Sequence, residues 1–153
     1  MKLAVACDHR GFEAKRRLLP VLRQQGHEVI DFGCDGPGSC DYPDFAIPAA
    51  RSVAEHQAEI GILMDGSGIG MSIAANKVRG IRAALVHDEL TARRAREHNH
   101  CNVLCLGTDL LSEELIRQIV HIFLTTEFEA SRHSRRIEKL AKLEDEESQR
   151  KLV

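Results

Sequence analysis

The sequence predicts a doubly wound α/β domain, with a five-stranded parallel sheet, helices on both faces and a further C-terminal helix. Three observations predict this fold. Short apolar runs of strand length each end in a polar or glycine-rich turn. Amphipathic stretches with apolar residues at helical spacing separate these runs. Strands that alternate with helices form parallel sheets, because each helix returns the chain to the starting edge of the sheet.

The elements follow one another in order along the chain. Strands are expected at residues 2–7, 28–32, 60–64, 82–86 and 103–106. Helices are expected at 11–25, 44–56, 70–76, 89–99 and 112–125, with a perturbed turn near Pro20. Asp88 and Ser112 stand where N-cap residues belong, and Glu113 and Glu114 favour the positive end of the helix that follows. These elements together predict a Rossmann-like α/β/α sandwich.

The last segment, 131–153, is highly charged and carries a narrow apolar stripe of Ile137, Leu140 and Leu143. A helix with so thin a stripe is suited to packing on a partner subunit, which predicts a homo-oligomer. A solvated helix end is the alternative for the part beyond Leu143. No repeat, linker or low-complexity stretch divides the chain, so residues 1–153 are expected to form a single domain.

The composition excludes several classes of protein. The chain has 153 residues, of which 43% are apolar and 29% charged, and its formal net charge is −2. This balance excludes a disordered chain, and 21 basic against 23 acidic residues give no signature of nucleic-acid binding. No apolar run approaches the roughly 18–20 residues that a membrane span requires. The first apolar stretch, at 3–7, is too short for a signal peptide.

The five cysteines lack Cys-x-x-Cys spacing and are expected to be reduced thiols of a cytoplasmic protein. Cys101 and Cys105, together with His98 and His100, raise the alternative of a metal site. Cys105 lies inside the apolar run 103–106, which favours a buried structural thiol. We therefore expect no metal site.

Polar side chains gather where the predicted strands end. The clusters comprise residues 8–11, 65–70, 87–88 and 107–109, and residues 41–44 in the loop after the second strand. One such turn has little meaning, because Asp and Gly are common in turns. Several turns at one edge of a parallel sheet indicate a ligand site, since ligands bind beyond the carboxyl ends of the strands.

The glycine loop at 66–70, with the sequence GSGIG, has the composition of an anion-binding loop. Glycines let the backbone approach a ligand closely, and N–H groups at the start of a helix hold an anion. The glycine spacing and the position after the third strand disfavour a dinucleotide site, and no Gly-Lys-Ser/Thr ending supports a Walker loop. An enediolate or oxyanion formed during a reaction is the remaining candidate.

Several blocks of sequence carry a family resemblance. They are CDHRGFE at 7–13, DYPD at 41–44, GSGIGMSIAANK at 66–77, GIRAA at 80–84, AREHN at 95–99, NVL at 102–104, and RH at 132–133 with Arg136. Because these blocks follow one another in this order, the chain resembles the ribose-5-phosphate isomerase B and galactose-6-phosphate isomerase family. The resemblance implies interconversion of an aldose phosphate and a ketose phosphate through a cis-enediolate, with no metal and no cofactor. Ribose 5-phosphate and ribulose 5-phosphate are the leading pair.

The resemblance also implies a homodimer with active sites shared between subunits, with a tetramer as the larger alternative. It assigns hydroxyl-proton transfer to Ser67 and opening of the furanose ring to His98, beside Asn99. The other implied substrate-binding residues are Asp8, His9 and Tyr42, the anion-hole residues Gly66, Gly68, Ile69 and Gly70, and the phosphate cluster Arg132, His133 and Arg136. Arg132 and Arg136 share one helix face, which suits a phosphate or, equally, a surface salt-bridge cluster.

Two positions depart from the family pattern. The family's base is a cysteine at the position of Asp65 or, in another branch, a glutamate at the position of Met71. Asp65 is therefore the leading candidate base, and burial would raise its pKa while amides and cations would lower it. The alternative role of Asp65 is to bind a substrate hydroxyl. Asp109 stands where many relatives have a phosphate-binding arginine, so another tetrose, pentose or hexose phosphate remains an alternative substrate.

The loss of both usual base residues motivates a second class of function, a sugar-phosphate-binding regulator without turnover. Ser67, His98 and Asn99 argue against it, because ring opening and proton transfer serve only catalysis. A third hypothesis is an isomerase that requires a non-identical partner chain.

Overall fold

The computed structural model describes residues 1–150 and contains a parallel sheet with the strand order β2-β1-β3-β5-β4. The strands are β1 (Lys2–Cys7), β2 (Glu28–Asp31), β3 (Ile60–Asp65), β4 (Ala83–Leu85) and β5 (Val103–Gly107). The helices are α1 (Phe12–Gln24), α2 (Pro43–Ala54), α3 (Ile69–Asn76), α4 (Glu89–Glu97), α5 (Glu113–Thr125) and α6 (Ala130–Gln149). None of the described helices is long and apolar enough to cross a membrane. The predicted doubly wound α/β fold is confirmed.

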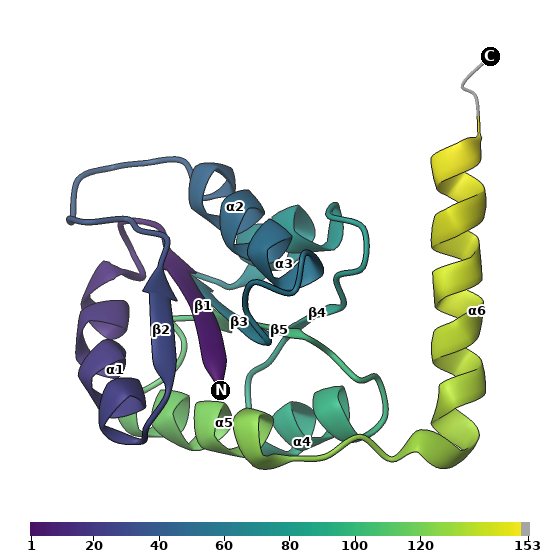
Figure 1. Ribbon diagram of the computed structural model, residues 1–153. Helices are drawn as coiled ribbons and strands as arrows, with labels where there is room; N and C mark the ends of the chain where they lie inside the picture. The colour runs from purple at the N-terminus through teal and green to yellow at the C-terminus, as the bar shows by residue number, and fades with distance from the viewer. Residues whose placement is uncertain (151–153) are drawn as a thin grey trace.

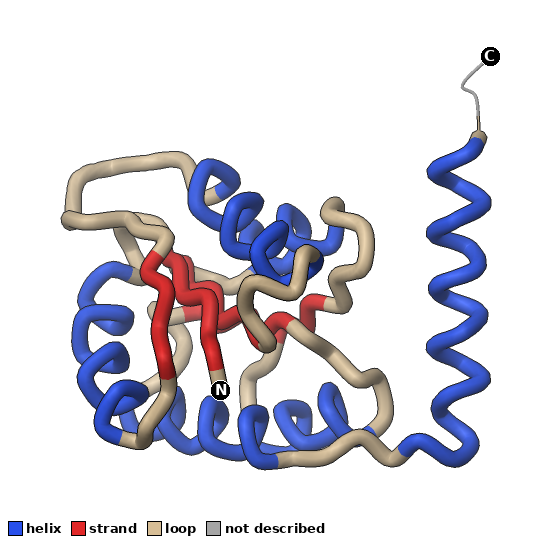
Figure 2. The backbone as a smooth tube through the Cα atoms, viewed as in Figure 1, coloured by secondary structure: helices blue, strands red, loops and turns tan. Residues whose placement is uncertain are grey.

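The sheet lies between two helix layers. Figure 1 shows α2 and α3 over one face and α1, α4 and α5 over the other, and the same layers flank the strands in Figure 2. Because successive side chains of a strand point to opposite faces, β1 sends Leu3 and Val5 into the core under α1, α4 and α5, and Ala4 into the core under α2 and α3. Burial on both faces explains why the strands read as continuous apolar runs.

The order of the strands places a crevice between β1 and β3. The chain pairs β2 with one side of β1 and β3 with the other, which makes β1 the point where the winding reverses. In parallel sheets a ligand site forms beyond the carboxyl ends of the strands at such a point. Asp8 follows β1 and Asp65 ends β3, and the register pairs Cys7 with Met64. The two carboxylates are therefore neighbours at the crevice.

Element boundaries follow the sequence signals closely. The predicted N-caps are confirmed, since the Asp88 carboxylate accepts a hydrogen bond from the Thr91 N–H at 2.7 Å and the Ser112 hydroxyl from the Leu115 N–H at 3.2 Å. Pro20 lies inside α1 without ending it. The fourth strand, expected at 82–86, spans only Ala83–Leu85, lies at the edge of the sheet and pairs with β5 alone.

The C-terminal helix α6 lies beyond the β4 edge of the sheet and stands apart from both helix layers (Figure 1). An ion pair between Arg79 and Asp145 links it to the loop that follows α3. Leu140 and Leu143 on this helix are 51% and 52% exposed. The predicted helix is thus confirmed, although residues 151–153 at its predicted end lie outside the described part of the chain. Its packing on a partner subunit stays a prediction.

Candidate active site

A pocket of about 380 Å³ opens beyond the carboxyl ends of β1 and β3. Its lining residues are Asp8, Arg10, Asp65, Gly66, Ser67, Asp109 and Leu110. Four predicted site residues therefore line one pocket: Asp8, Asp65, Gly66 and Ser67. Arg10 and the side chain of Asp109 join them, although sequence reasoning gave neither a binding role. No local pattern signals this pair, because the two residues are far apart in the chain.

The glycine loop between β3 and α3 holds a conformation that requires glycine at its centre. Gly68 has φ +78°, in the left-handed region, and a Cβ added there would collide with the side chain of Leu85. α3 begins directly afterwards, and the first N–H groups of a helix have no partner within it. The N–H groups of Gly68 and Met71 bind Asp65 and that of Ile69 binds Ser67, so the Gly70 N–H is the one placed to face an anion among these described residues. Ser67 Oγ accepts a hydrogen bond from the Ile69 N–H at 3.2 Å, which orients the hydroxyl.

Asp65 is 5% exposed and is tied to this loop through both carboxylate oxygens. Oδ1 accepts a hydrogen bond from the Gly68 N–H, and Oδ2 accepts one from the Met71 N–H at 3.2 Å. Burial raises the pKa of Asp65, and the charge of Asp8 adds to this effect. The two amides lower the pKa but do not outweigh burial. The group is therefore a stronger base than an exposed aspartate, and it also holds the loop in place.

Asp8 lines the pocket, whereas His9 and Tyr42 lie beside the turn after β1 and the glycine loop without lining it. Asp8 Oδ1 accepts hydrogen bonds from the N–H groups of Arg10 at 2.8 Å and Gly11 at 3.1 Å, so the carboxylate shapes the turn after β1. His9 Nδ1 lies 3.8 Å from Asp8 Oδ2. The ring of Tyr42 lies over the glycine loop, since a Cβ added to Gly70 would approach its carbons to 2.9 Å.

The remaining predicted residues lie at the opposite edge of the sheet. α4 runs back from the carboxyl edge, so its C-cap His98 lies where β5 begins, next to Asn99. The Glu129 N–H donates to the Glu97 carbonyl at 2.9 Å and brings the start of α6 to this edge. That segment carries Arg132, His133 and Arg136. The length of β5, roughly 13 Å, separates the amino edge of the sheet from its carboxyl edge. One chain therefore does not bring His98 and Asp65 together.

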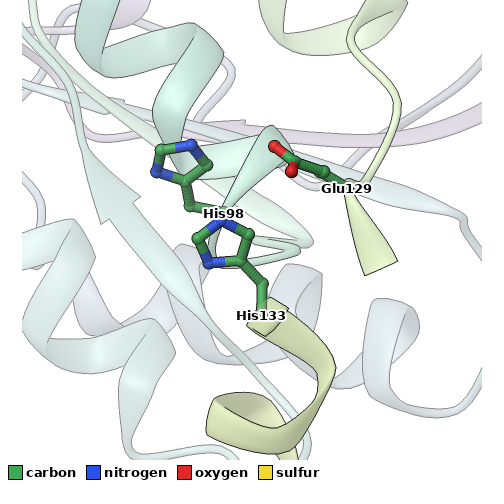
Figure 3. Close-up of side chains that lie close together, drawn as sticks. All are labelled: His98, Glu129 and His133. Atoms are coloured by element: carbon green, nitrogen blue, oxygen red, sulfur yellow. The ribbon is translucent and has the colours of Figure 1, made fainter. Parts of the chain in front are cut away.

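His98 and His133 stack face to face beside Glu129, as Figure 3 shows. The ring centroids are 4.2 Å apart and the planes meet at 15°. Arg94 Nη1 lies 2.8 Å from His98 Nε2, and because a guanidinium can only donate, Nε2 accepts and the ring proton is assigned to Nδ1. Burial, His98 and Arg132 lower the pKa of His133, which favours its neutral form at neutral pH.

The trio of His98, Glu129 and His133 has three ligand atoms within 4.8 Å of one another, a spacing that could hold a metal ion. Stacked rings, however, direct their ring-plane lone pairs side by side rather than toward one point. The guanidinium groups of Arg94 and Arg132 contact the two rings, so each ring nitrogen that they contact is already engaged and is not directed at an ion. Sequence reasoning missed Glu129, because only the fold brings it to His98.

The cysteines weighed for a metal site are core residues. Cys105 is fully buried and Cys101 is 6% exposed. Burial raises the pKa of Cys101 to about 11 and raises that of Cys105 further, so neither is a thiolate at neutral pH. The interpretation of Cys105 as a structural thiol is confirmed.

The fold and site define an α/β protein with a glycine loop before a helix and a buried carboxylate at its topological switch point. Residues 3–140 match the protein family described as Ribose/Galactose Isomerase. The chain is 47% identical over 146 residues to the Bacillus subtilis (strain 168) protein named "Putative sugar phosphate isomerase YwlF", covering 95% of this chain and 98% of that relative.

Solved structures agree with this match. A ribose-5-phosphate isomerase B from Clostridium thermocellum superposes with a TM-score of 0.94 at 42% identity, covering 96% of this chain and 99% of that one. The Mycoplasma genitalium ribose-5-phosphate isomerase B with bound ribulose-5-phosphate gives a TM-score of 0.91 at 39% identity, covering 95% and 97%. The chain belongs to the ribose/galactose isomerase family.

Proposed function

We propose that the protein is an aldose–ketose isomerase of sugar phosphates that interconverts ribose 5-phosphate and ribulose 5-phosphate without a cofactor. The observation that carries the proposal is Asp65, a buried carboxylate with a raised pKa beside an anion-binding loop in the switch-point pocket. A base of raised pKa suits proton abstraction next to a carbonyl near neutral pH. The substrates named for the relatives support the same class of reaction.

The geometry supports a defined path for two protons. Asp65 removes the proton from C2 of the open-chain aldose, and the electron pair forms the C1–C2 double bond of the enediolate. The Gly70 N–H at the start of α3, which lies among amides that already bind Asp65 and Ser67, stabilises the negative charge on oxygen. Ser67 carries the hydroxyl proton from O2 to O1. Asp65 then returns its proton to C1, which completes the ketose and restores the carboxylate.

Completion of the site requires a second copy of the chain. Asp65 and Ser67 lie at the carboxyl edge of the sheet, whereas His98 and the phosphate cluster lie at the amino edge. In a two-fold dimer, the amino edge of one subunit can meet the carboxyl edge of the other. The exposed Leu140 and Leu143 of α6 supply an apolar surface for that contact. The dimer is the proposed functional unit, with a tetramer as its larger assembly, and the cytoplasmic location stays a prediction.

One observation favours a second function, binding without turnover. Both carboxylate oxygens of Asp65 accept backbone hydrogen bonds, so the residue could serve the loop alone. Incubation of the protein with ribose 5-phosphate, erythrose 4-phosphate and allose 6-phosphate, followed by sugar analysis, separates the two functions. Ketose formation from one of them by the homo-oligomer supports the isomerase and removes the need for a non-identical partner. Calorimetric binding without any ketose supports the regulator.

A further inference from the structure

Arg10 and Asp109 form an ion pair at the pocket that contains Asp65. Arg10 Nε and Nη2 lie 2.8 Å and 2.6 Å from Asp109 Oδ2. Both side chains line the pocket together with Asp8 and Ser67. A Cβ added to Gly66 would lie 2.7 Å from Asp109 Oδ2 and 3.0 Å from Arg10 Nε, so the pair rests directly on the glycine loop.

Backbone contacts fix both partners relative to the catalytic loop. The Arg10 N–H donates to Asp8 Oδ1 at 2.8 Å, and the Arg10 carbonyl accepts from Thr108 Oγ1 at 3.1 Å. The Asp109 N–H donates to the Gly66 carbonyl at 3.0 Å. The two residues are separated by 99 positions in sequence, yet each is anchored to a segment that shapes the pocket. The side chain of Arg10 is 57% exposed, which leaves it accessible to a ligand.

The charged side chains that line the pocket are mostly acidic, and Arg10 offsets part of this negative charge. Its lining includes the carboxylates of Asp8, Asp65 and Asp109, and Arg10 is the single cation among the described lining residues. A phosphate placed near Asp109 alone would be repelled. The hydrogen bond to Asp109 raises the pKa of Arg10, and the guanidinium offsets that carboxylate. A guanidinium has five N–H donors, of which Asp109 engages those on one edge, so the other edge can receive an oxyanion.

We propose that Arg10 binds the phosphate group of the substrate and that Asp109 acts as its positioning residue. This inference rests on the proposed function, because it names the substrate contact made by the subunit that provides Asp65. It also explains how an aspartate is tolerated at position 109 in a site for anionic sugars.

The test compares Arg10→Ala, Asp109→Asn and the double variant with the wild-type protein. Arg16→Ala is the matched control, because Arg16 forms an exposed ion pair with Glu13 away from the pocket. Isothermal calorimetry measures the Kd for ribose 5-phosphate and for inorganic phosphate, and a coupled assay measures kcat and KM.

We expect Arg10→Ala to raise both Kd values and the KM about tenfold or more, as for loss of a charged hydrogen bond, with kcat nearly unchanged. Asp109→Asn should raise them several-fold in the wild-type background, because Arg10 loses its positioning partner. Once Arg10 is absent, Asp109→Asn should lower them, because it removes a carboxylate that repels the phosphate. Arg16→Ala should change none of them.

A purely structural ion pair would lower the unfolding temperature of Arg10→Ala while leaving both Kd values unchanged, and that result would overturn the proposal. Failure of the wild-type protein to bind either anion would overturn it as well. If the wild-type protein binds ribose 5-phosphate without forming ketose, the isomerase function fails, but the Kd comparison still decides the role of Arg10.

Discussion

Dimers that contain one subunit of each of two inactive variants test whether the active site combines residues from both subunits. Asp65→Asn removes the base at the carboxyl edge, and His98→Asn removes the ring-opening group at the amino edge. If each site takes Asp65 from one subunit and His98 from the other, a mixed dimer contains one intact site and one site with both defects. Each homodimer of a single variant contains only defective sites.

The expected magnitude follows from counting sites. When the two variants are produced together in equal amounts, about half of the dimers are mixed, so about a quarter of all sites are intact. We expect about a quarter of wild-type isomerase activity in the mixture, above the sum of the two separate variants. Coexpression with two different affinity tags allows the mixed dimer to be isolated and assayed. Activity no greater than the sum of the single variants would refute a site shared between subunits.

Four further predictions test the geometry. Gly68→Ala forces a positive φ on alanine, which costs about 1–2 kcal/mol of stability, and places a Cβ against the side chain of Leu85 in β4. Urea unfolding should therefore show a large loss of stability. The control Gly36→Ala should show no such loss, because no atom lies near the added Cβ. Since burial raises the pKa of Asp65, the acid limb of kcat/KM should lie above pH 3.8. The same shift means that Asp65 stabilises the fold at low pH and that this contribution is lost as pH rises through the raised pKa, so Asp65→Asn should flatten the dependence of unfolding free energy on pH. Glutamate at Leu140 or Leu143 should shift sedimentation toward the monomer, and an unchanged dimer would place the interface elsewhere.

Much of the carboxyl-edge site could be predicted from the sequence, because parallel topology dictates where strands end. Asp8 and Asp65 follow apolar runs, and the strand order brings those ends together. The glycine loop can likewise be recognised in the sequence, since a residue in the left-handed conformation before a helix favours glycine. The pKa of Asp65 could not be predicted, because it depends on the balance between its burial and the amides of Gly68 and Met71.

Contacts between distant segments could not be predicted from local patterns. Arg10 meets Asp109 only because the turns after β1 and β5 both lie beside the glycine loop. Glu129 reaches His98 because the segment after α5 hydrogen-bonds to the end of α4. The sequence also does not display the separation between His98 and Asp65, which emerges once α4 is seen to run back across the sheet.

The role of Asp65 as the base is tested most directly by proton exchange at C2 of ribose 5-phosphate in deuterated water. Wild-type protein, Asp65→Asn and the exposed control Asp35→Asn are compared by NMR, with calorimetry to confirm that each variant binds the sugar. The account predicts that deuterium incorporation and ketose formation disappear in Asp65→Asn, with binding retained, and persist in Asp35→Asn. Exchange at the wild-type rate in Asp65→Asn would contradict the account and assign the base to another residue.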